Sequence, residues 1–238
     1  MLVPLTRQKF EQIIPLIATG AQYAYYWGKF ADFLKRLMIS VVAVTVLFFT
    51  YKIVGEGFGG LIFFLGIFAG LYWLWGPIYW ASIRNAGSRR YLYAGFWRGR
   101  VLDIFVSEEL IGEEQTVNKR GQLVIIENRE RRLNLEVGDD SGFSTSLQVP
   151  LRRLHKSIRR GQIAEMVVMS NRPDLSSIVK VSDIYIPDLN LWVSDYPYVR
   201  RDVFSLISRK LENTDDEYYP SKQERKPKRR KRPQTDRL

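Results

Sequence analysis

Residue types that carry out chemistry in proteins are scarce in this sequence. Its 238 residues include no Cys and one His, His155. The lack of Cys excludes a disulfide framework, a thiolate zinc site, an iron–sulfur cluster and a cysteine nucleophile. One imidazole cannot supply a zinc site built from several His residues, nor a mechanism that needs two imidazoles. These counts exclude whole classes of active site. They leave the redox compartment open, because a Cys-free chain fits any compartment.

The remaining titratable residues do not form a catalytic pattern. His155 lies in the basic run LRRLHKSIRRG, where neighbouring positive charges disfavour its protonated form, and we expect an ordinary surface residue. The acidic pairs Glu113–Glu114 and Asp139–Asp140 fall in predicted turns, and DDSG lacks the ligand spacing of a calcium-binding loop. The sequence contains no phosphate-binding lysine loop, dinucleotide fingerprint or GxSxG motif. We therefore predict a non-enzymatic protein with no catalytic residue, cofactor or metal site.

Two apolar windows dominate the first third of the chain. Residues 57–83 are 27 consecutive residues without a charge, and residues 37–54 are apolar for 15 residues before Lys52. About 20 apolar helical residues cross roughly 30 Å of hydrocarbon, and the long stem of a lysine lets its charge reach the interface. The short connection is rich in glycine, which favours a turn. The sequence predicts two antiparallel transmembrane helices, 37–54 and 57–83, in a hairpin over 37–83.

Basic residues flank this predicted hairpin on both sides. They occur before the first span and within residues 84–100, which we predict to be a juxtamembrane linker. The connection between the spans contains only one basic residue, Lys52. Because positive residues concentrate on the cytoplasmic side of membrane helices, we expect both termini in the cytoplasm or the stroma. The membrane-flanking residues are Lys35, Arg36, Arg84, Arg89, Arg90, Arg98 and Arg100.

Residues 1–36 are too polar to cross a membrane, yet they are rich in aromatic residues. Aromatic side chains settle at the headgroup level of membranes and are also enriched in protein contacts. Two interpretations are therefore weighted equally. One is an interfacial helix or pair of helices, broken near Pro15 and Gly20, and the other is a segment that contacts protein. A second aromatic set is expected to form the belt of the second span: Tyr72, Trp73, Trp75, Tyr79 and Trp80.

Residues 101–212 have the short alternating pattern of β-strands. About six runs, among them 101–106, 132–137 and 143–149, are separated by turn-rich strings such as GDDSG. We expect a small, mainly antiparallel β barrel or sandwich that ends with a helix near 198–211. The predicted fold is thus a membrane helical hairpin followed by a cytoplasmic β domain.

The positive charge of the chain lies mostly outside this β domain. The formal net charge is +11, but residues 101–212 are nearly neutral, and residues 213–238 form a predicted disordered basic tail. A nucleic-acid-binding barrel is expected to carry its own basic face, so nucleic acid is a disfavoured partner. The residues expected to bind lipid or an acidic partner are Arg152, Arg153, Lys156, Arg159, Arg160, Lys226, Lys228, Arg229, Arg230, Lys231 and Arg232. For the cluster at 152–160, a solvated helix face is the favoured alternative.

Within the predicted spans there is no Asp, Glu, Arg or His. Transport pathways and proton relays usually need polar groups at mid-depth, so the spans are typical of an anchor. Gly66 and Gly70 have the small-xxx-small spacing that lets another helix pack closely.

Three strings resemble a known family: VPLTRQKFEQIIPLIATGAQYAYYWGKF at the start, and GPIYWAS and YAGFWRGRVLDIFV around the end of the second span. They are similar to uncharacterised membrane proteins of cyanobacteria and related plastids, some of them labelled phosphate-transporter permeases. The resemblance covers residues 1 to about 212. It implies a thylakoid or plasma membrane setting and brings no catalytic residues. This chain lacks the additional spans and the ATPase-coupling surface of a typical permease subunit.

These observations favour a non-enzymatic membrane scaffold, assembly factor or accessory subunit of a larger membrane complex, with membrane lipids and a membrane protein as partners. Two alternatives stay open. One is a channel or transporter component, in which Gly66 and Gly70 mediate oligomer packing. The other is a membrane-tethered RNA or ribosome binder that uses residues 222–238.

Overall fold

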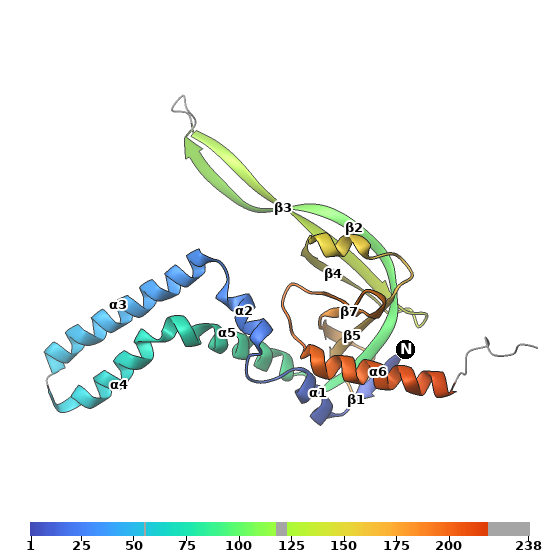
Figure 1. Cartoon of the computed structure of the whole chain (residues 1–238), viewed down its shortest axis with the longest axis horizontal. Coiled ribbons are helices and arrows are strands. Elements are labelled where there is room, and N and C mark those ends of the chain that lie inside the picture. The colour runs from blue at the N-terminus through green and yellow to red at the C-terminus, as the bar shows by residue number, and fades with distance from the viewer. Residues whose placement is uncertain (55, 118–122, 219–238) are drawn as a thin grey trace, which may run out of the picture. The chain divides into compact units, whose positions relative to one another are not determined.

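The computed structural model describes residues 1–54, 56–117 and 123–218. The chain forms two compact units, Met1–Arg201 and Asp202–Leu238. The first unit contains a set of N-terminal helices and one β-sheet (Figure 1). The described part of the second unit continues helix α6, which spans Arg201–Tyr218 and extends beyond the expected end at residue 211.

Three helices follow a short first strand, β1 (Leu2–Leu5), that the sequence pattern did not indicate. Helix α1 spans Arg7–Ile13 and helix α2 spans Gly20–Trp27, on either side of Pro15. Thr19 begins α2 with a capping box, in which its hydroxyl accepts the Gln22 backbone N–H and the Gln22 side chain accepts the Thr19 N–H. Helix α3 then runs without interruption over Phe30–Val54.

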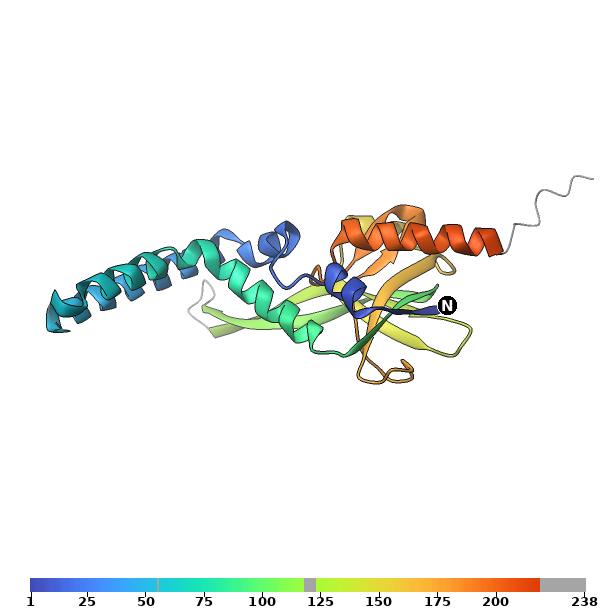
Figure 2. The ribbon, with the colours of Figure 1, turned by 90° about the horizontal axis from the view of Figure 1, so that it is seen from below.

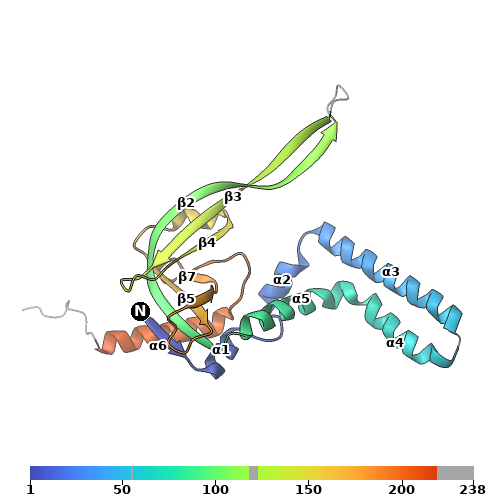
Figure 3. The ribbon, with the colours of Figure 1, turned by 180° about the vertical axis from the view of Figure 1, so that it is seen from behind.

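Helix α3 is the one described helix that is by itself long and apolar enough to cross a membrane. The 3₁₀ turn η1 (Glu56–Phe58) connects it to α4 (Gly59–Gly70), which runs beside α3 (Figures 1 and 3). Helix α5 (Tyr72–Arg89) follows at a bend of 74°, so α4 and α5 reach the length and hydropathy of a span only as a pair. The continuous helix expected over 57–83 is therefore two helices.

Side chains explain why the bend at Leu71 is stable. The helix break follows Gly70, a residue of low helix propensity, and leaves backbone groups without intrahelical partners. The indole Nε1 of Trp75 donates to the Phe68 carbonyl (2.8 Å), across the bend. The backbone N–H of Trp73 donates to the buried Ser40 hydroxyl of α3 (3.2 Å). Both ends of the break are thus hydrogen-bonded by neighbouring side chains.

Seven strands follow the helices and join β1 in one antiparallel sheet. They are β2 (Tyr93–Val117), β3 (Leu123–Gly138), β4 (Ser144–Pro150), β5 (Ile163–Ser170), β6 (Ile178–Val181), β7 (Ile184–Ile186) and β8 (Leu191–Val193). The strand order is β4-β3-β2-β5-β7-β8, with β1 paired to β2 and β6 to β5. The sheet is open, with β4 and β8 at its two ends, and does not form the expected closed barrel or two-sheet sandwich.

Strand β2 pairs with three other strands, β1, β3 and β5, and it begins earlier in the sequence than expected. The chain passes from α5 into β2 at Tyr93 (Figure 2), so the predicted linker 84–100 contains a helix end and a strand. Residues 93–100 of β2 pair with β5, and residues 100–117 pair with β3. The register shifts between Val101 and Asp103, where the strand passes from one partner to the other.

The core packs on one face of this sheet, around Trp97 of β2. It contains Leu133, Leu135, Met166 and Ile184, all fully or almost fully buried. The Trp97 ring lies against Gly99, where an added Cβ would be only 2.3 Å from the ring, so this position requires glycine. Its indole N–H donates to Asp139 (2.7 Å), which satisfies the one polar group of a buried tryptophan.

Beyond the core, β2 and β3 continue as a two-stranded ribbon. Among the described strands, residues 108–117 and 123–131 pair with each other alone, and the ribbon extends past the other strands (Figure 1). Ion pairs join Arg131 to Glu108 (3.3 Å) and Arg132 to Glu109 (2.7 Å) across it. Such exposed pairs contribute little stability individually.

Candidate functional site

A buried polar cluster joins the helices to the sheet. Gln22 of α2 and Asn85 of α5 are both fully buried, and their side-chain amides form two hydrogen bonds of 3.1 and 2.8 Å. Gln22 also donates to the carbonyls of Pro197 (2.9 Å) and Tyr198 (3.3 Å), in the segment after β8. The pair therefore holds two helices and the end of the sheet domain together.

Asp183, between β6 and β7, fixes the same segment from the sheet side. Its carboxylate accepts the backbone N–H of Tyr198 (2.9 Å) and of Val199 (3.4 Å), and the side chain is buried. Burial raises the pKa of Asp183 to about 7, although these two hydrogen bonds and the charge of Arg201 oppose the shift. The ionised form is therefore held at a cost in solvation.

Aromatic rings and cations complete the cluster. The hydroxyl of Tyr196 donates to Asn85 (3.3 Å), and burial raises the pKa of this tyrosine. The guanidinium of Arg84 lies 4.2 Å from the ring centre of Tyr196, and its Nε donates to the Tyr198 hydroxyl (3.1 Å). Lys180 lies 4.3 Å from the Tyr198 ring centre. Contacts of this kind hold a cation on ring faces and stabilise the packing of helix against sheet.

The predicted membrane-flanking cations divide into two groups. Arg84, Arg36, Arg89 and Arg98 have partners inside the protein: Arg36 donates to the carbonyls of Tyr26 and Trp27 at the end of α2, Arg89 pairs with Glu11, and Arg98 pairs with Glu165. Lys35, Arg90 and Arg100 are exposed, and Lys35 lies 4.0 Å from the carboxylate of Asp32 on the same helix. More than half of the predicted basic flank is thus part of the protein's own packing.

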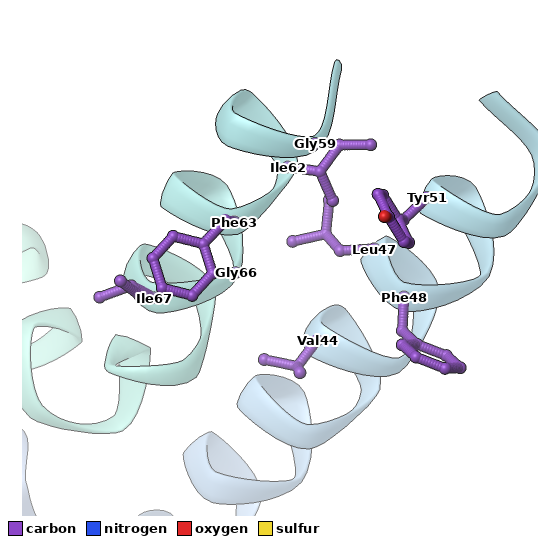
Figure 4. Close-up of a pocket in the computed structure, with 9 residues that line it drawn as sticks. All are labelled: Val44, Leu47, Phe48, Tyr51, Gly59, Ile62, Phe63, Gly66 and Ile67. Atoms are coloured by element: carbon purple, nitrogen blue, oxygen red, sulfur yellow. The ribbon is translucent and has the colours of Figure 1, made fainter. Parts of the chain in front are cut away.

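The two glycines that were predicted to pack against another helix, Gly66 and Gly70, have different surroundings. A Cβ on Gly70 would contact Val44 of α3 at 3.5 Å, so Gly70 faces the inside of the hairpin. A Cβ on Gly66 would meet nothing within 4 Å. Gly66 lies in an open apolar groove of about 550 Å³ between α3 and α4 (Figure 4). The groove is lined by Val44, Leu47, Phe48, Tyr51, Gly59, Ile62, Phe63, Gly66 and Ile67.

The predicted lipid or partner cluster lies in the connection between β4 and β5, around the 3₁₀ turn η2 (Arg153–Ser157). Arg152, Arg153, Lys156 and Arg159 are exposed, and the exposed Arg160 pairs with Asp103. His155 is 4% exposed, so the expectation of a surface histidine is wrong. The cause is the turn, which points the imidazole inward; burial and the charge of Arg152 lower the pKa of His155.

The predicted tail residues Lys226, Lys228, Arg229, Arg230, Lys231 and Arg232 lie outside the described residues. Within residues 1–54, 56–117 and 123–218, no group of three or more His, Asp or Glu side chains could hold a metal ion.

Sequence reasoning missed the buried polar cluster. Nothing in the local sequence indicates that four of its residues meet in the fold: Gln22, Asn85, Asp183 and Tyr196. One usable signal was the spacing of Thr19 and Gln22, which is that of a capping box. Another was an acid between two apolar strands, at Asp183.

Comparison with known proteins places the chain in a family. A family model matches residues 3–216, and its description is a family of unknown function, DUF8619. No curated protein and no solved structure matches the chain. The matched range includes the apolar helices, all of the sheet except Leu2, the buried polar cluster and most of α6. The chain therefore belongs to DUF8619, a family of unknown function.

Proposed function

We propose that this chain is an integral membrane protein whose α3–α4 hairpin anchors the sheet domain and binds a partner subunit within the membrane. The observation that carries the proposal is the outward exposure of apolar side chains on the hairpin. Only 6% of the apolar window of α3 is buried, and Phe63 and Phe64 of α4 are 67% and 75% exposed. Soluble monomers rarely expose apolar patches of more than a few hundred Å². Surrounding lipid would cover these apolar side chains and keep them out of water.

Aromatic residues from three helices support a boundary at one end of the hairpin. Trp27, Phe33 and Trp73 pack together, with ring centres 5.7 Å apart for two of the pairs and 6.3 Å apart for the third. Such aromatic clusters are typical of the interface between hydrocarbon and water. In this arrangement α3 crosses the hydrocarbon, and α4 and α5 pass back through it together as one span that is broken at Leu71. The resemblance noted from sequence favours the thylakoid or plasma membrane of a photosynthetic cell.

The absence of Cys makes topology directly measurable, since any introduced cysteine is the only one. In sealed vesicles whose cytoplasmic or stromal face points outward, we expect Asn171→Cys, exposed between β5 and β6, to react with a membrane-impermeant maleimide. Gly57→Cys, in η1, should react only after permeabilisation. The protein should stay in the pellet after carbonate extraction. Release by carbonate, or labelling of both positions in sealed vesicles, would contradict a hairpin that crosses the membrane.

The groove beside Gly66 supports the partner part of the proposal. Its lining is almost entirely apolar, and its glycine leaves room for a second helix to approach closely. A photocrosslinking amino acid at Phe63 should give a discrete adduct in native membranes. Gly66→Leu should remove that adduct without destabilising the hairpin, because a Cβ there meets nothing within 4 Å.

Gly60→Leu is the matched control for this experiment. A Cβ at Gly60 also meets nothing within 4 Å, yet Gly60 does not line the groove, so the adduct should persist. Equal loss of the adduct in both variants would show that the groove does not bind the partner.

A further inference from the structure

The turn between β4 and β5 combines exposed cations with an exposed apolar side chain at its centre. Within the described parts of the chain, Arg152, Arg153, Lys156 and Arg159 make no side-chain ion pair. Leu154, among them, is 68% exposed. Four cations without carboxylate partners repel one another, and exposure of the apolar Leu154 side chain to water is unfavourable. The arrangement is unfavourable in isolation and favourable against an anionic surface with an apolar interior.

Hydrogen bonds hold Leu154 in its outward position. The buried His155 accepts the backbone N–H of Arg152 at Nδ1 (3.3 Å), and its own backbone N–H donates to the Arg152 carbonyl (3.1 Å). The Ser157 hydroxyl donates to the Leu154 carbonyl (2.7 Å). At the end of the turn, the Gly161 N–H donates to the Val101 carbonyl of β2 (2.8 Å). The turn is therefore a fixed projection from the sheet, with His155 as its inward anchor.

We propose that residues 152–159 bind the anionic headgroups of phospholipids and that Leu154 enters the interfacial layer beneath them. This proposal rests on the membrane anchoring proposed above, which keeps the sheet domain next to a bilayer. Lys and Arg near an anionic leaflet are attracted to it within a Debye length, about 10 Å at 0.1 M salt. An RNA surface is a poorer fit, because residues 151–161 contain no Phe, Tyr or Trp on which a base could stack, and the His155 ring is buried.

A fluorescent probe at position 154 tests the proposal in the full-length protein. Leu154→Cys gives a single attachment site for an environment-sensitive nitrobenzoxadiazole probe in the Cys-free chain. The labelled protein is reconstituted in nanodiscs of phosphatidylcholine, with or without phosphatidylglycerol, that contain a quencher-bearing lipid. We expect blue-shifted emission and quenching with phosphatidylglycerol, loss of both at high salt, and neither effect in phosphatidylcholine alone. A probe at Asn171→Cys should stay unquenched in every disc.

Two charge variants of equal net charge make the test specific. Replacing Arg152, Arg153 and Lys156 by Ser should abolish quenching at position 154. Replacing Arg129, Arg131 and Arg172 by Ser should not, because these exposed cations already have carboxylate partners. Recovery of all variants in the nanodisc fraction verifies anchoring separately, so that loss of anchoring and loss of headgroup binding are distinguishable.

Three outcomes would overturn the proposal. The first is a probe that stays unquenched in phosphatidylglycerol although the protein is in the disc. The second is shielding of the probe in detergent without lipid, which would indicate a protein contact. The third is a response to added RNA in detergent together with none to phosphatidylglycerol.

Discussion

The α3–α4 hairpin and the β-sheet place their large apolar side chains in opposite environments. In the sheet, Leu135, Met166 and Ile184 are fully buried, whereas Phe63 and Phe64 of the hairpin are mostly exposed. Burial of apolar surface contributes about 25 cal/mol per Å², so the sheet gains this free energy within the chain. The hairpin gains it only when something else covers it. The stability of the sheet is therefore a property of the chain, and that of the hairpin depends on its surroundings.

Polar groups show the same difference between the two regions. Along the hairpin, Thr45 and Thr50 donate to carbonyls one turn earlier in their own helix, so these side chains join nothing together. At the junction with the sheet, Gln22, Asn85 and Asp183 bond to residues far away in the sequence. Specific directional bonds thus position the helices against the sheet, while apolar contacts of low specificity dominate the hairpin.

The largest expected effect on stability is that of a substitution in the sheet, compared with a similar substitution in the hairpin. Leu135→Ala leaves a cavity in a closed core and should lower the free energy of unfolding by about 2–5 kcal/mol. Phe64→Ala on the hairpin should change it by less than about 0.5 kcal/mol, because this ring is 75% exposed. Denaturant titration in mild detergent, followed by near-ultraviolet circular dichroism, measures both. Equal effects would mean that the Phe64 ring is covered within the chain as the Leu135 side chain is.

Asp183 makes the junction sensitive to pH. Its pKa is about 7 in the folded protein and about 3.9 in an unfolded chain. Because the folded-state pKa is raised, its stabilising contribution is complete below pH 4 and is lost as the pH rises through 7. Asp183→Asn cannot ionise and should lack this decline, so its stability relative to wild type should increase between pH 4 and 8, by up to about 4 kcal/mol at 1.36 kcal/mol per pKa unit.

Unfolding free energies of wild type and Asp183→Asn, measured at intervals from pH 4 to pH 8, check this expectation. A hydrogen bond lost in Asp183→Asn would add a pH-independent offset to the expected change without removing the change. Parallel curves throughout the range would show that Asp183 titrates as it does in the unfolded chain.

A smaller effect is expected from the amide pair of the junction. Asn85→Leu removes both amide–amide hydrogen bonds with Gln22, whose side-chain carbonyl keeps the Thr19 N–H, at a cost of about 1–3 kcal/mol. The double variant with Gln22→Leu should cost less than the sum of the two single substitutions, because no half-paired amide remains between the helices. A double-mutant cycle of unfolding free energies gives the coupling. Additive losses would show that the two side chains act independently.

Features with a local cause were predictable from the sequence. The apolar helix α3 follows from an uncharged run, and several strands follow from alternating residues between turns. The start of β2 was missed because the aromatic and basic residues of 93–100 are also typical of a membrane flank. The open sheet was missed because closure depends on whether β4 and β8 meet, which no local pattern records.

Features that depend on distant contacts were not predictable. The orientation of His155 depends on a turn fixed to β2 through Gly161 and Arg160. The cluster of Gln22 with Asn85 and Pro197 joins positions 63 and 175 residues apart in the sequence. Most predicted flanking cations proved to have internal partners, because a count of charges does not show where carbonyls and carboxylates lie.

The smallest expected effect concerns the bend at Leu71, which belongs to the hairpin and yet has directional bonds. Trp75→Phe keeps the ring and removes the N–H that bonds to the Phe68 carbonyl, so the angle between α4 and α5 should become less well defined. Spin labels at Gly60→Cys and Gly87→Cys, positions where a side chain meets nothing within 4 Å, report that angle as a distance distribution. The distribution should broaden in Trp75→Phe. It should stay narrow in Trp80→Phe, which loses only a bond to the Tyr72 hydroxyl within α5. A distribution unchanged in both variants would mean that the bond from Trp75 to the Phe68 carbonyl does not set the bend, which would leave apolar packing and the bond from Trp73 to Ser40 as its causes.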